Sequence, residues 1–452
     1  MESSDPLKRA QILTIRAYWT PKPRTLSANT LYRGAVNSPP SPALQTLRIE
    51  TVGAQGDGLA AGPVYVPLTL PGELVSASVS GDRAEMAEVL EPSPDRVAPP
   101  CPHFGDCGGC SLQHWASAPY LAWKGEQVRQ ALARERIETE IAATFATPPG
   151  VRRRLALHAR RDGHQVRIGF KARRSWRLVE LTACTIADPR LVAALPALKA
   201  LAEPFLAHPR SAPTLHVTWT ASGLDVDVTG VERKRGALSA DARARAARAA
   251  ALGDVARVTL ASETIYQSRT PMVRIGPATV ALPAGGFLQA SVEAETAMAA
   301  VVCDAVAGAA RVADLFCGVG TFTFRLAQTA AIQAIDSSEA AVKALMSAVG
   351  MAPGLKAITA EARDLSRRPL LAMEMKKLDA VVFDPPRAGA AEQAREIAAS
   401  KVPLAVGVSC NVQTFARDAR ILADAGFTLT KVHPIDQFLW SPHVELVGVF
   451  RR

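Results

Sequence analysis

Long apolar runs are missing from this sequence, although 48% of its 452 residues are hydrophobic. No segment approaches the roughly 18–20 consecutive apolar residues that a membrane-spanning helix requires. The first residues also lack the order of charged, apolar and small residues that marks an export signal. These absences predict a cytoplasmic protein that has no membrane partner.

Cysteine is scarce too, with seven residues in the chain. Few cysteines in a long chain without an export signal are expected to be thiols or metal ligands rather than disulfides. Cys101, Cys107 and Cys110 nevertheless lie close together in "CPHFGDCGGC", and Cys184 in "LTACTIADP" is the best fourth candidate. Four thiolates suit a tetrahedral zinc ion or a 4Fe–4S cluster. Zinc knuckles favour two short C-x2-C pairs, so the C-x5-C-x2-C spacing with one distant cysteine favours the cluster.

Acidic residues are outnumbered, since 42 Asp and Glu face 52 Lys and Arg, which gives a formal net charge of +10. Such a surface tolerates or attracts a polyanion. In residues 151–177 arginines alternate with apolar residues, as expected if one sheet face packs inward and the other faces phosphates. A solvated charged face is the alternative. The clustered stripe favours RNA as the partner.

The length of the chain suggests two or three domains. Residues 1–45 are rich in Pro, Ser and Thr and are expected to form a disordered leader. Residues 46–95 contain short strand-like runs broken by Gly, Pro and Asp, which predict a small β-barrel. Residues 96–285 are expected to form a central α+β domain. In residues 286–452 strands alternate with helices, which predicts a parallel sheet.

A nucleoside site is predicted by the segment "VADLFCGVGTFTFRLA". An apolar strand ends at Asp314, a turn follows with Gly318 and Gly320, and a second strand ends at Asp336. In open α/β sheets ligands bind beyond the carboxyl ends of the strands. The third glycine of the dinucleotide motif is absent, which favours S-adenosylmethionine over NAD. An ordinary strand–helix turn is the alternative.

Three further polar residues follow or interrupt apolar strands. Asp384 in "VVFDPPRAG" is held by two prolines, which stop the strand and stiffen the chain. Cys410 in "VGVSCNVQTFARD" directly precedes a predicted helix, and a helix N-terminus is expected to lower the pKa of its thiol. Glu445 lies among apolar residues in "SPHVELVGVF", two residues after His443.

Together the motifs "DLFCGVGTF", "DPPRAG", "SCNVQTFARD" and "PIDQF…HVE" resemble those of the S-adenosylmethionine-dependent RNA uracil-C5 methyltransferases. The resemblance extends from residue 46 to residue 452. It implies an N-terminal OB-type RNA-binding barrel called a TRAM domain, a central domain with a 4Fe–4S site, and a C-terminal Rossmann-like class I methyltransferase domain. The overall fold class is therefore a multidomain α/β protein. One departure is "FLWSPHVE", where the family usually has Phe-Pro before a Thr.

The resemblance also implies roles for individual residues. Cys410 would be the nucleophile and Glu445 the general base. Cofactor binding would fall to Gln289, Phe316, Thr321, Asp336 and Asp384, and the cluster ligands would be Cys101, Cys107, Cys110 and Cys184.

The implied chemistry accounts for these residue types. A thiolate adds to uracil C6, which makes C5 nucleophilic towards the methyl group. A carboxylate then removes the C5 proton, and the thiol is eliminated. The TRAM domain and the cysteines resemble the enzymes that act on 23S rRNA, and we expect a monomer. A transfer-RNA uracil methyltransferase and a non-catalytic RNA-binding or ribosome-assembly factor are the alternatives.

Overall fold

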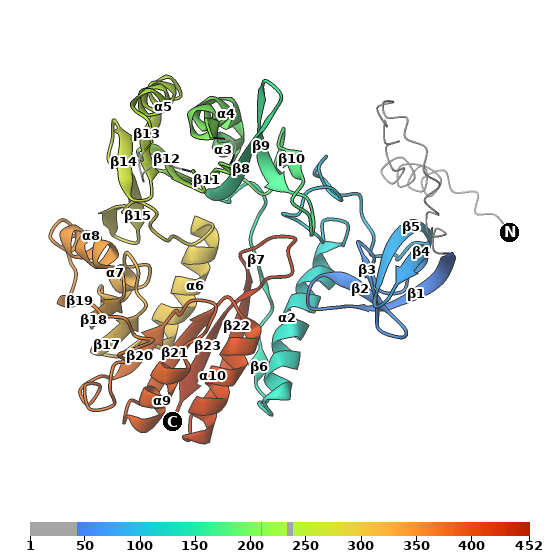
Figure 1. Ribbon diagram of the computed structural model, residues 1–452. Helices are drawn as coiled ribbons and strands as arrows, with labels where there is room; N and C mark the ends of the chain where they lie inside the picture. The colour runs from blue at the N-terminus through green and yellow to red at the C-terminus, as the bar shows by residue number, and fades with distance from the viewer. Residues whose placement is uncertain (1–42, 209, 233–237) are drawn as a thin grey trace, which may run out of the picture. The chain divides into compact units, whose positions relative to one another are not determined.

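The computed structural model of the chain describes residues 43–208, 210–232 and 238–452 (Figure 1). The predicted leader lies outside the described residues, except at its end, where the first strand already begins at Leu44. Two compact units make up the described chain. The first comprises residues up to Pro100 together with Ser111–Pro119, and the second comprises Cys101–Cys110 and Tyr120–Arg452. In these described residues no helix is long and apolar enough to cross a membrane.

The first unit contains the predicted barrel. Five strands close in the order β1-β2-β3-β5-β4. They are β1 (Leu44–Val52), β2 (Asp57–Ala60), β3 (Val64–Pro67), β4 (Leu74–Ser80) and β5 (Arg83–Glu91). Alternate side chains such as Val75 and Ala77 are fully buried in its centre. The buried Glu73 carboxylate accepts hydrogen bonds from Arg96 Nη2 (2.7 Å) and the Leu70 backbone N–H (2.8 Å), so it anchors the chain that leaves the barrel.

The second unit holds two large sheets, of which the first has seven strands in the order β10-β9-β8-β11-β12-β13-β14. These strands are β8 (Arg154–Asp162), β9 (Gln165–Lys171), β10 (Leu178–Glu180), β11 (Thr214–Thr220), β12 (Gly223–Thr229), β13 (Val255–Leu260) and β14 (Glu263–Gln267). The helical segments α3 (Pro189–Ala193), α4 (Leu195–Ala202), η1 (Glu203–Leu206) and α5 (Ala240–Leu252) share its hydrophobic core. A separate two-stranded sheet pairs β15 (Met272–Ile275) with β16 (Ala278–Ala281).

The arginine-rich residues 151–177 supply β8 and β9, and their apolar side chains do alternate into the core, as Leu155 and Leu157 illustrate. The arginines do not all face outward, however. Arg153 is buried and donates to the Glu295 carboxylate (2.6 Å), which also accepts from Arg325 (2.8 Å). A buried charge needs a partner of opposite charge. Arg153 therefore serves a structural ion pair and not a phosphate contact.

The second large sheet has the order β19-β18-β17-β20-β21-β23-β22-β6, and β7 also pairs with β22. Its strands are β6 (Glu140–Ile141), β7 (Phe145–Ala146), β17 (Arg311–Leu315), β18 (Ala331–Asp336), β19 (Ile358–Ala362), β20 (Ala380–Phe383), β21 (Leu404–Ser409), β22 (Thr428–Asp436) and β23 (Glu445–Arg451). The strands from β19 to β21 are parallel, as predicted. β23 departs from that prediction, since it is antiparallel to β21 and β22. The connection 437–444 is too short for the crossover that parallel strands need.

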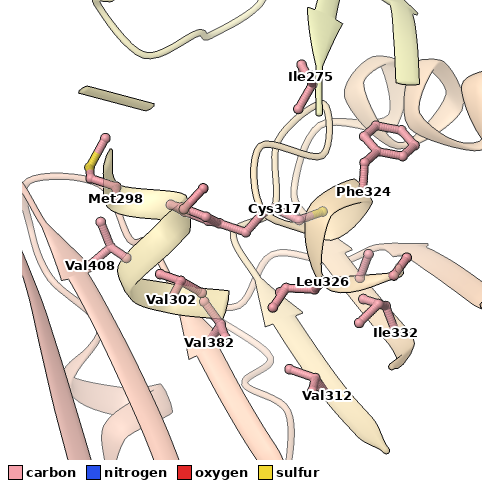
Figure 2. Close-up of a cluster of buried hydrophobic side chains, with 14 of the residues drawn as sticks. Ile275, Met298, Val302, Val312, Cys317, Phe324, Leu326, Ile332, Val382 and Val408 are labelled. Atoms are coloured by element: carbon pink, nitrogen blue, oxygen red, sulfur yellow. The ribbon is translucent and has the colours of Figure 1, made fainter. Parts of the chain in front are cut away.

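Helices cover both faces of this sheet (Figure 1). They are α2 (Ser117–Arg134), α6 (Val292–Ala305), α7 (Thr323–Leu326), α8 (Glu339–Val349), α9 (Ala391–Ala399) and α10 (Val412–Asp424). Side chains alternate between two cores: Val382 of β20 packs in the core of α6 and α8, whereas Val381 packs in that of α2, α9 and α10. Figure 2 shows Met298 and Val302 of α6 within the first core.

Residues well before the C-terminal region complete this sheet. The short strands β6 and β7 pair in parallel with β22 at its edge. Lys124 of α2 forms an ion pair with Asp436, the last residue of β22, and both side chains are fully buried. Lys124 Nζ also donates to the carbonyl oxygens of Phe438 (3.4 Å) and His443. One ammonium group thereby fixes α2, the end of β22 and the connection that leads to β23.

The replacement Lys124→Met should therefore destabilise the protein strongly, because it leaves a buried carboxylate without its partner. We expect a loss of about 3–5 kcal/mol in the free energy of unfolding, measured by urea denaturation. Lys199→Met is the matched control. Its partner Glu180 is about as exposed as Lys199 itself, at 37% and 40%, and such surface pairs contribute at most about 1 kcal/mol. Equal losses for the two variants would contradict the prediction.

Candidate active site

The predicted site residues meet at the carboxyl edge of the nine-stranded sheet. Asp314 lies near the end of β17, Asp384 follows β20 and Cys410 follows β21, and these three strands are neighbours. Glu445 begins β23, whose antiparallel direction brings it to the same edge, with Leu446 opposite Ser409. The strand order reverses between β17 and β20, where such sheets bind their ligands. The topology thus assembles residues that lie far apart in the sequence.

A chain of hydrogen bonds connects the two carboxyl groups through two amides. Gln289 Nε2 donates to Asp384 Oδ2 (3.2 Å), and Gln437 Nε2 donates to both Gln289 Oε1 (2.9 Å) and Glu445 Oε1 (3.1 Å). The Gln437 Oε1 atom accepts from the Ala290 backbone N–H (2.8 Å). Both glutamines are buried. Their amide groups therefore fix the positions of Asp384 and Glu445.

Gln437 is a site residue that the sequence analysis did not single out. The sequence offers one indication of its role, because its polar amide directly follows Asp436 at the end of an apolar strand. His443 was the more conspicuous neighbour of Glu445 in sequence. Its ring instead lies edge-on to Phe438, with 6.0 Å between the ring centroids. Glu445 is held by Gln437.

Burial raises the pKa of three carboxyl groups at this edge, those of Asp314, Asp384 and Glu445. The pKa of Glu445 is raised to about 8 by burial and then by the neighbouring Asp384. Burial followed by the proximity of Asp314 raises that of Asp384 to about 7. The pKa of Asp314 is raised to about 7, again chiefly by burial. These pKa values lie near neutral pH, the range that suits a general acid or base.

The expectation that the pKa of the Cys410 thiol is lowered was wrong. Its pKa is raised to about 11, first by burial and then by Glu445 and Asp384, although Arg387 partly offsets these effects. The N-terminus of α10 does not stabilise the thiolate, because the Asn411 side chain caps this helix. The Asn411 Oδ1 atom accepts from the Gln413 backbone N–H (3.0 Å). The thiol thus depends on Arg387 for a positive neighbour.

The turn after β17 fits a nucleoside cofactor. The Gly318 backbone adopts φ +55°, and a β-carbon added there would meet nothing within 4 Å, so the turn leaves open space beside the chain. Phe316 also has a positive φ of 62°. Asp336 accepts from the Gly318 backbone N–H (2.9 Å) at the end of β18. The buried Asp314 Oδ1 has no hydrogen-bond partner in the described residues, which leaves an acceptor for a ligand amine. Thr321 is buried next to this turn.

The four predicted cluster cysteines share one neighbourhood in the second unit. Burial raises the pKa of Cys107, and Cys184 and Cys101 contribute to the rise as nearby negative groups. Cys110 and Cys184 both lie close enough to Arg152 to affect its pKa, which burial lowers. Backbone N–H groups of Ala187 and Ile186 donate to the Cys184 sulfur.

The segments that carry these cysteines are also connected directly. The Thr182 backbone N–H donates to His103 Nε2 (3.1 Å), and Cys107 forms a β-bridge with Ala172. Within the described residues no group of three or more His, Cys, Asp or Glu side chains is arranged to hold a metal ion.

Comparisons with known proteins were consistent with one another. A family model described as tRNA (Uracil-5-)-methyltransferase matches residues 279–452. An uncharacterized RNA methyltransferase of Caulobacter vibrioides is 64% identical, over 90% of this chain and 100% of the relative. The 23S rRNA (uracil(1939)-C(5))-methyltransferase RlmD of Halomonas elongata is 36% identical, over 84% of this chain and 83% of its own length.

A solved structure has the same fold as most of the chain. The tRNA (uracil-54, C5)-methyltransferase of Pyrococcus abyssi, in complex with S-adenosyl-L-homocysteine, aligns with a TM-score of 0.68 at 22% sequence identity. The alignment covers 90% of this chain and 99% of that structure.

The strand order and the open glycine turn beside buried carboxyl groups define a methyltransferase of class I fold. With the relatives that match most of its length, the chain belongs to the family of RNA uracil-C5 methyltransferases, which use S-adenosylmethionine.

The raised pKa of Glu445 predicts a pH-dependent gain in stability for Glu445→Gln. Its folded pKa of about 8 exceeds the ordinary 4.5, so the contribution of this carboxyl to stability falls as pH rises through that window. Glutamine does not titrate. The melting temperature of the variant should therefore exceed that of the wild type increasingly from about pH 5 to about pH 8, by a few °C, because 1 kcal/mol shifts the melting temperature of a domain of 150–250 residues by about 2–4 °C and that of a larger one by less.

Glu138→Gln, at an exposed position, is the control for this comparison and should not alter the melting temperature with pH. A Glu445→Gln melting curve that tracks the wild type at every pH would show that the Glu445 carboxyl is not destabilising in its ionised form.

Proposed function

We propose that this protein methylates C5 of a uridine in RNA, most specifically in 23S rRNA, through a covalent adduct between Cys410 and uracil C6. The observation that carries this proposal is the placement of Cys410 directly after β21 and of Glu445 at the start of β23, the antiparallel neighbour of β21. A nucleophile and a base on one sheet edge, beside an open cofactor turn, are the parts that the reaction needs.

S-adenosylmethionine, when bound at the turn of Phe316, Gly318 and Thr321 with Asp336, supplies the methyl group as an electrophile. Side chains of the protein carry out the remaining steps. The Cys410 sulfur bonds to C6 of the uracil, and the ring becomes an enolate whose C5 is nucleophilic. Arg387 favours the thiolate, because its side chain partly offsets the rise in the pKa of Cys410 that burial and the carboxyl groups cause. Neutralising the neighbouring Glu445 and Asp384 carboxyl groups would remove their contribution to the raised pKa of Cys410.

Glu445 completes the cycle. Once C5 carries the methyl group, the Glu445 carboxylate removes the C5 proton, the electron pair of that C–H bond restores the C5–C6 double bond, and the Cys410 sulfur leaves. Gln437 holds Glu445 towards the ring through its 3.1 Å hydrogen bond. Gln289 Nε2 donates a hydrogen bond of 3.2 Å to Asp384 Oδ2. The Asp384 carboxylate is suited to accept from the uracil N3–H, and the Gln289 amide is suited to donate to a uracil carbonyl group.

Single-turnover assays with labelled RNA test this mechanism. Cys410→Ala should reduce methyl transfer by at least about 1000-fold, because removing a nucleophile leaves only binding effects, while cofactor affinity stays within a few-fold. Glu445→Gln should transfer the methyl group and then stall, so a slow-migrating protein–RNA band should accumulate on a denaturing gel. The double variant should form no such band. Substantial turnover by Cys410→Ala would remove this residue from the mechanism.

Among RNA targets, we propose 23S rRNA over tRNA. The relative from Halomonas elongata is named for 23S rRNA, whereas the family model and the Pyrococcus abyssi structure are named for tRNA. The four neighbouring cysteines and the barrel, which we propose binds RNA, support the ribosomal assignment. Competition between 23S rRNA fragments and tRNA transcripts for methylation distinguishes the two. Binding without methylation of either would instead support a non-catalytic assembly factor.

We also propose that Cys101, Cys107, Cys110 and Cys184 hold a 4Fe–4S cluster with a structural role. Each thiolate of such a cluster bonds a different iron, so the four sulfurs stand farther apart than the ligands of a single ion. The nearby cationic Arg152 and the N–H groups that donate to Cys184 and Cys107 suit a negatively charged cluster. Because the reaction needs no electron, the cluster would connect the cysteine loop to the seven-stranded sheet.

Anaerobic purification tests the cluster. The wild-type protein should be brown, with broad absorbance near 400 nm and about four irons per chain, as expected for four thiolate ligands. Cys184→Ala should lose this iron and melt at a lower temperature. Cys303→Ala, outside the group, is the control and should keep its iron. One equivalent of zinc without iron would overturn the assignment.

A further inference from the structure

The tip of the β9–β10 hairpin and the cysteine loop enclose a groove away from the catalytic edge. Residues 108–109 and 170–176 line its volume of about 480 Å³, which falls within the roughly 300–1,000 Å³ range of small-ligand sites. Trp176 is 74% exposed on this groove. A tryptophan so exposed presents a large apolar ring on which a ligand can stack.

Positive charge surrounds the exposed ring. The Lys171 ammonium lies 3.8 Å from the centroid of the Trp176 ring. Arg173 and Arg174 complete the basic lining of the groove. A flat aromatic face among cations matches the two parts of a nucleotide, because the base stacks on the ring and the phosphate meets the cations.

The groove is held rigidly by its surroundings. The Gly108 backbone N–H donates to the Lys171 carbonyl (2.9 Å), and the Ala172 N–H donates to the Arg177 carbonyl (2.7 Å). A β-carbon on Gly108 would approach the Lys171 carbonyl oxygen to 2.8 Å, so only glycine allows this contact. The cysteine loop therefore forms one wall of the groove, and its position is set before any ligand binds.

We propose that this groove is a second RNA site, in which an unpaired nucleotide stacks its base on Trp176 while Lys171 and the neighbouring arginines meet its phosphates. This inference rests on the proposed RNA substrate. It adds a second contact with that RNA, at a nucleotide bound away from the catalytic edge. Because a paired base is already covered by its neighbours in a helix, the groove selects single-stranded segments.

Binding of fluorescein-labelled oligouridine to the full-length protein, measured by anisotropy at several salt concentrations, tests the groove. Trp176→Ala should weaken binding about 5- to 100-fold, the usual effect of losing one stacked base, with an unchanged salt slope. Trp176→Phe should retain most of the affinity. Lys171→Gln should instead reduce the salt slope by about one. A duplex of equal length should lose little affinity in any variant.

Leu252→Ala is the control, because Leu252 is 84% exposed and lies outside the groove. Unchanged oligouridine affinity in Trp176→Ala, or an equal loss for the duplex, would overturn the proposal. So would tighter, Trp176-dependent binding of labelled polyglutamate, which would indicate an acidic protein partner. Methylation by the wild-type protein is assayed separately: if no uridine is methylated, the proposed function fails while the oligouridine series still reports on the groove.

Discussion

Asp314 and Glu445 are buried at one edge of the sheet beside the half-buried Asp384, and burial raises the pKa of all three carboxyl groups. Neighbouring carboxylates add to the rise, since Asp384 acts on Glu445 and Asp314 acts on Asp384. Desolvated like charges cannot all ionise at little cost. Two neutral amides, Gln289 and Gln437, hold Asp384 and Glu445 in place without neutralising them. A cationic group beside these carboxyl groups would favour their ionised forms, and the sulfonium of S-adenosylmethionine carries such a charge.

The scaffold around this edge uses fully paired charges instead. Lys124 with Asp436 fixes the end of β22 directly before Gln437, and Glu295 with Arg153 and Arg325 connects the two large sheets beside Gln289. Each ion pair lies next to an amide of the hydrogen-bond chain in sequence or in space. These ion pairs thus hold the elements that carry the carboxyl groups of the site, which have no cationic partner of this kind among the described residues. Stabilising residues and functional residues are commonly divided in this way.

Much of this organisation could be predicted from local patterns. The barrel, the parallel strands and the acids that end β17 and β18 each follow from short runs of sequence. The antiparallel β23, the role of Gln437 and the raised pKa of Cys410 could not be, because each depends on neighbours far away in the chain. The same holds for Arg153, whose partner Glu295 is remote in sequence.

The pairing of β21 with β23 has a consequence for motion. Cys410 directly follows β21 and Glu445 begins β23, and the spacing of such paired strands is about 4.8 Å. The backbones beside the two residues cannot separate unless the sheet itself opens, which is slow and costly. In the proposed reaction, entry of a flipped base and release of product would therefore rely on movements of the loops at this edge, such as 437–444 and the turn after β17. The rate of turnover would then depend on loop motion, while the strands beside Cys410 and Glu445 stay in place.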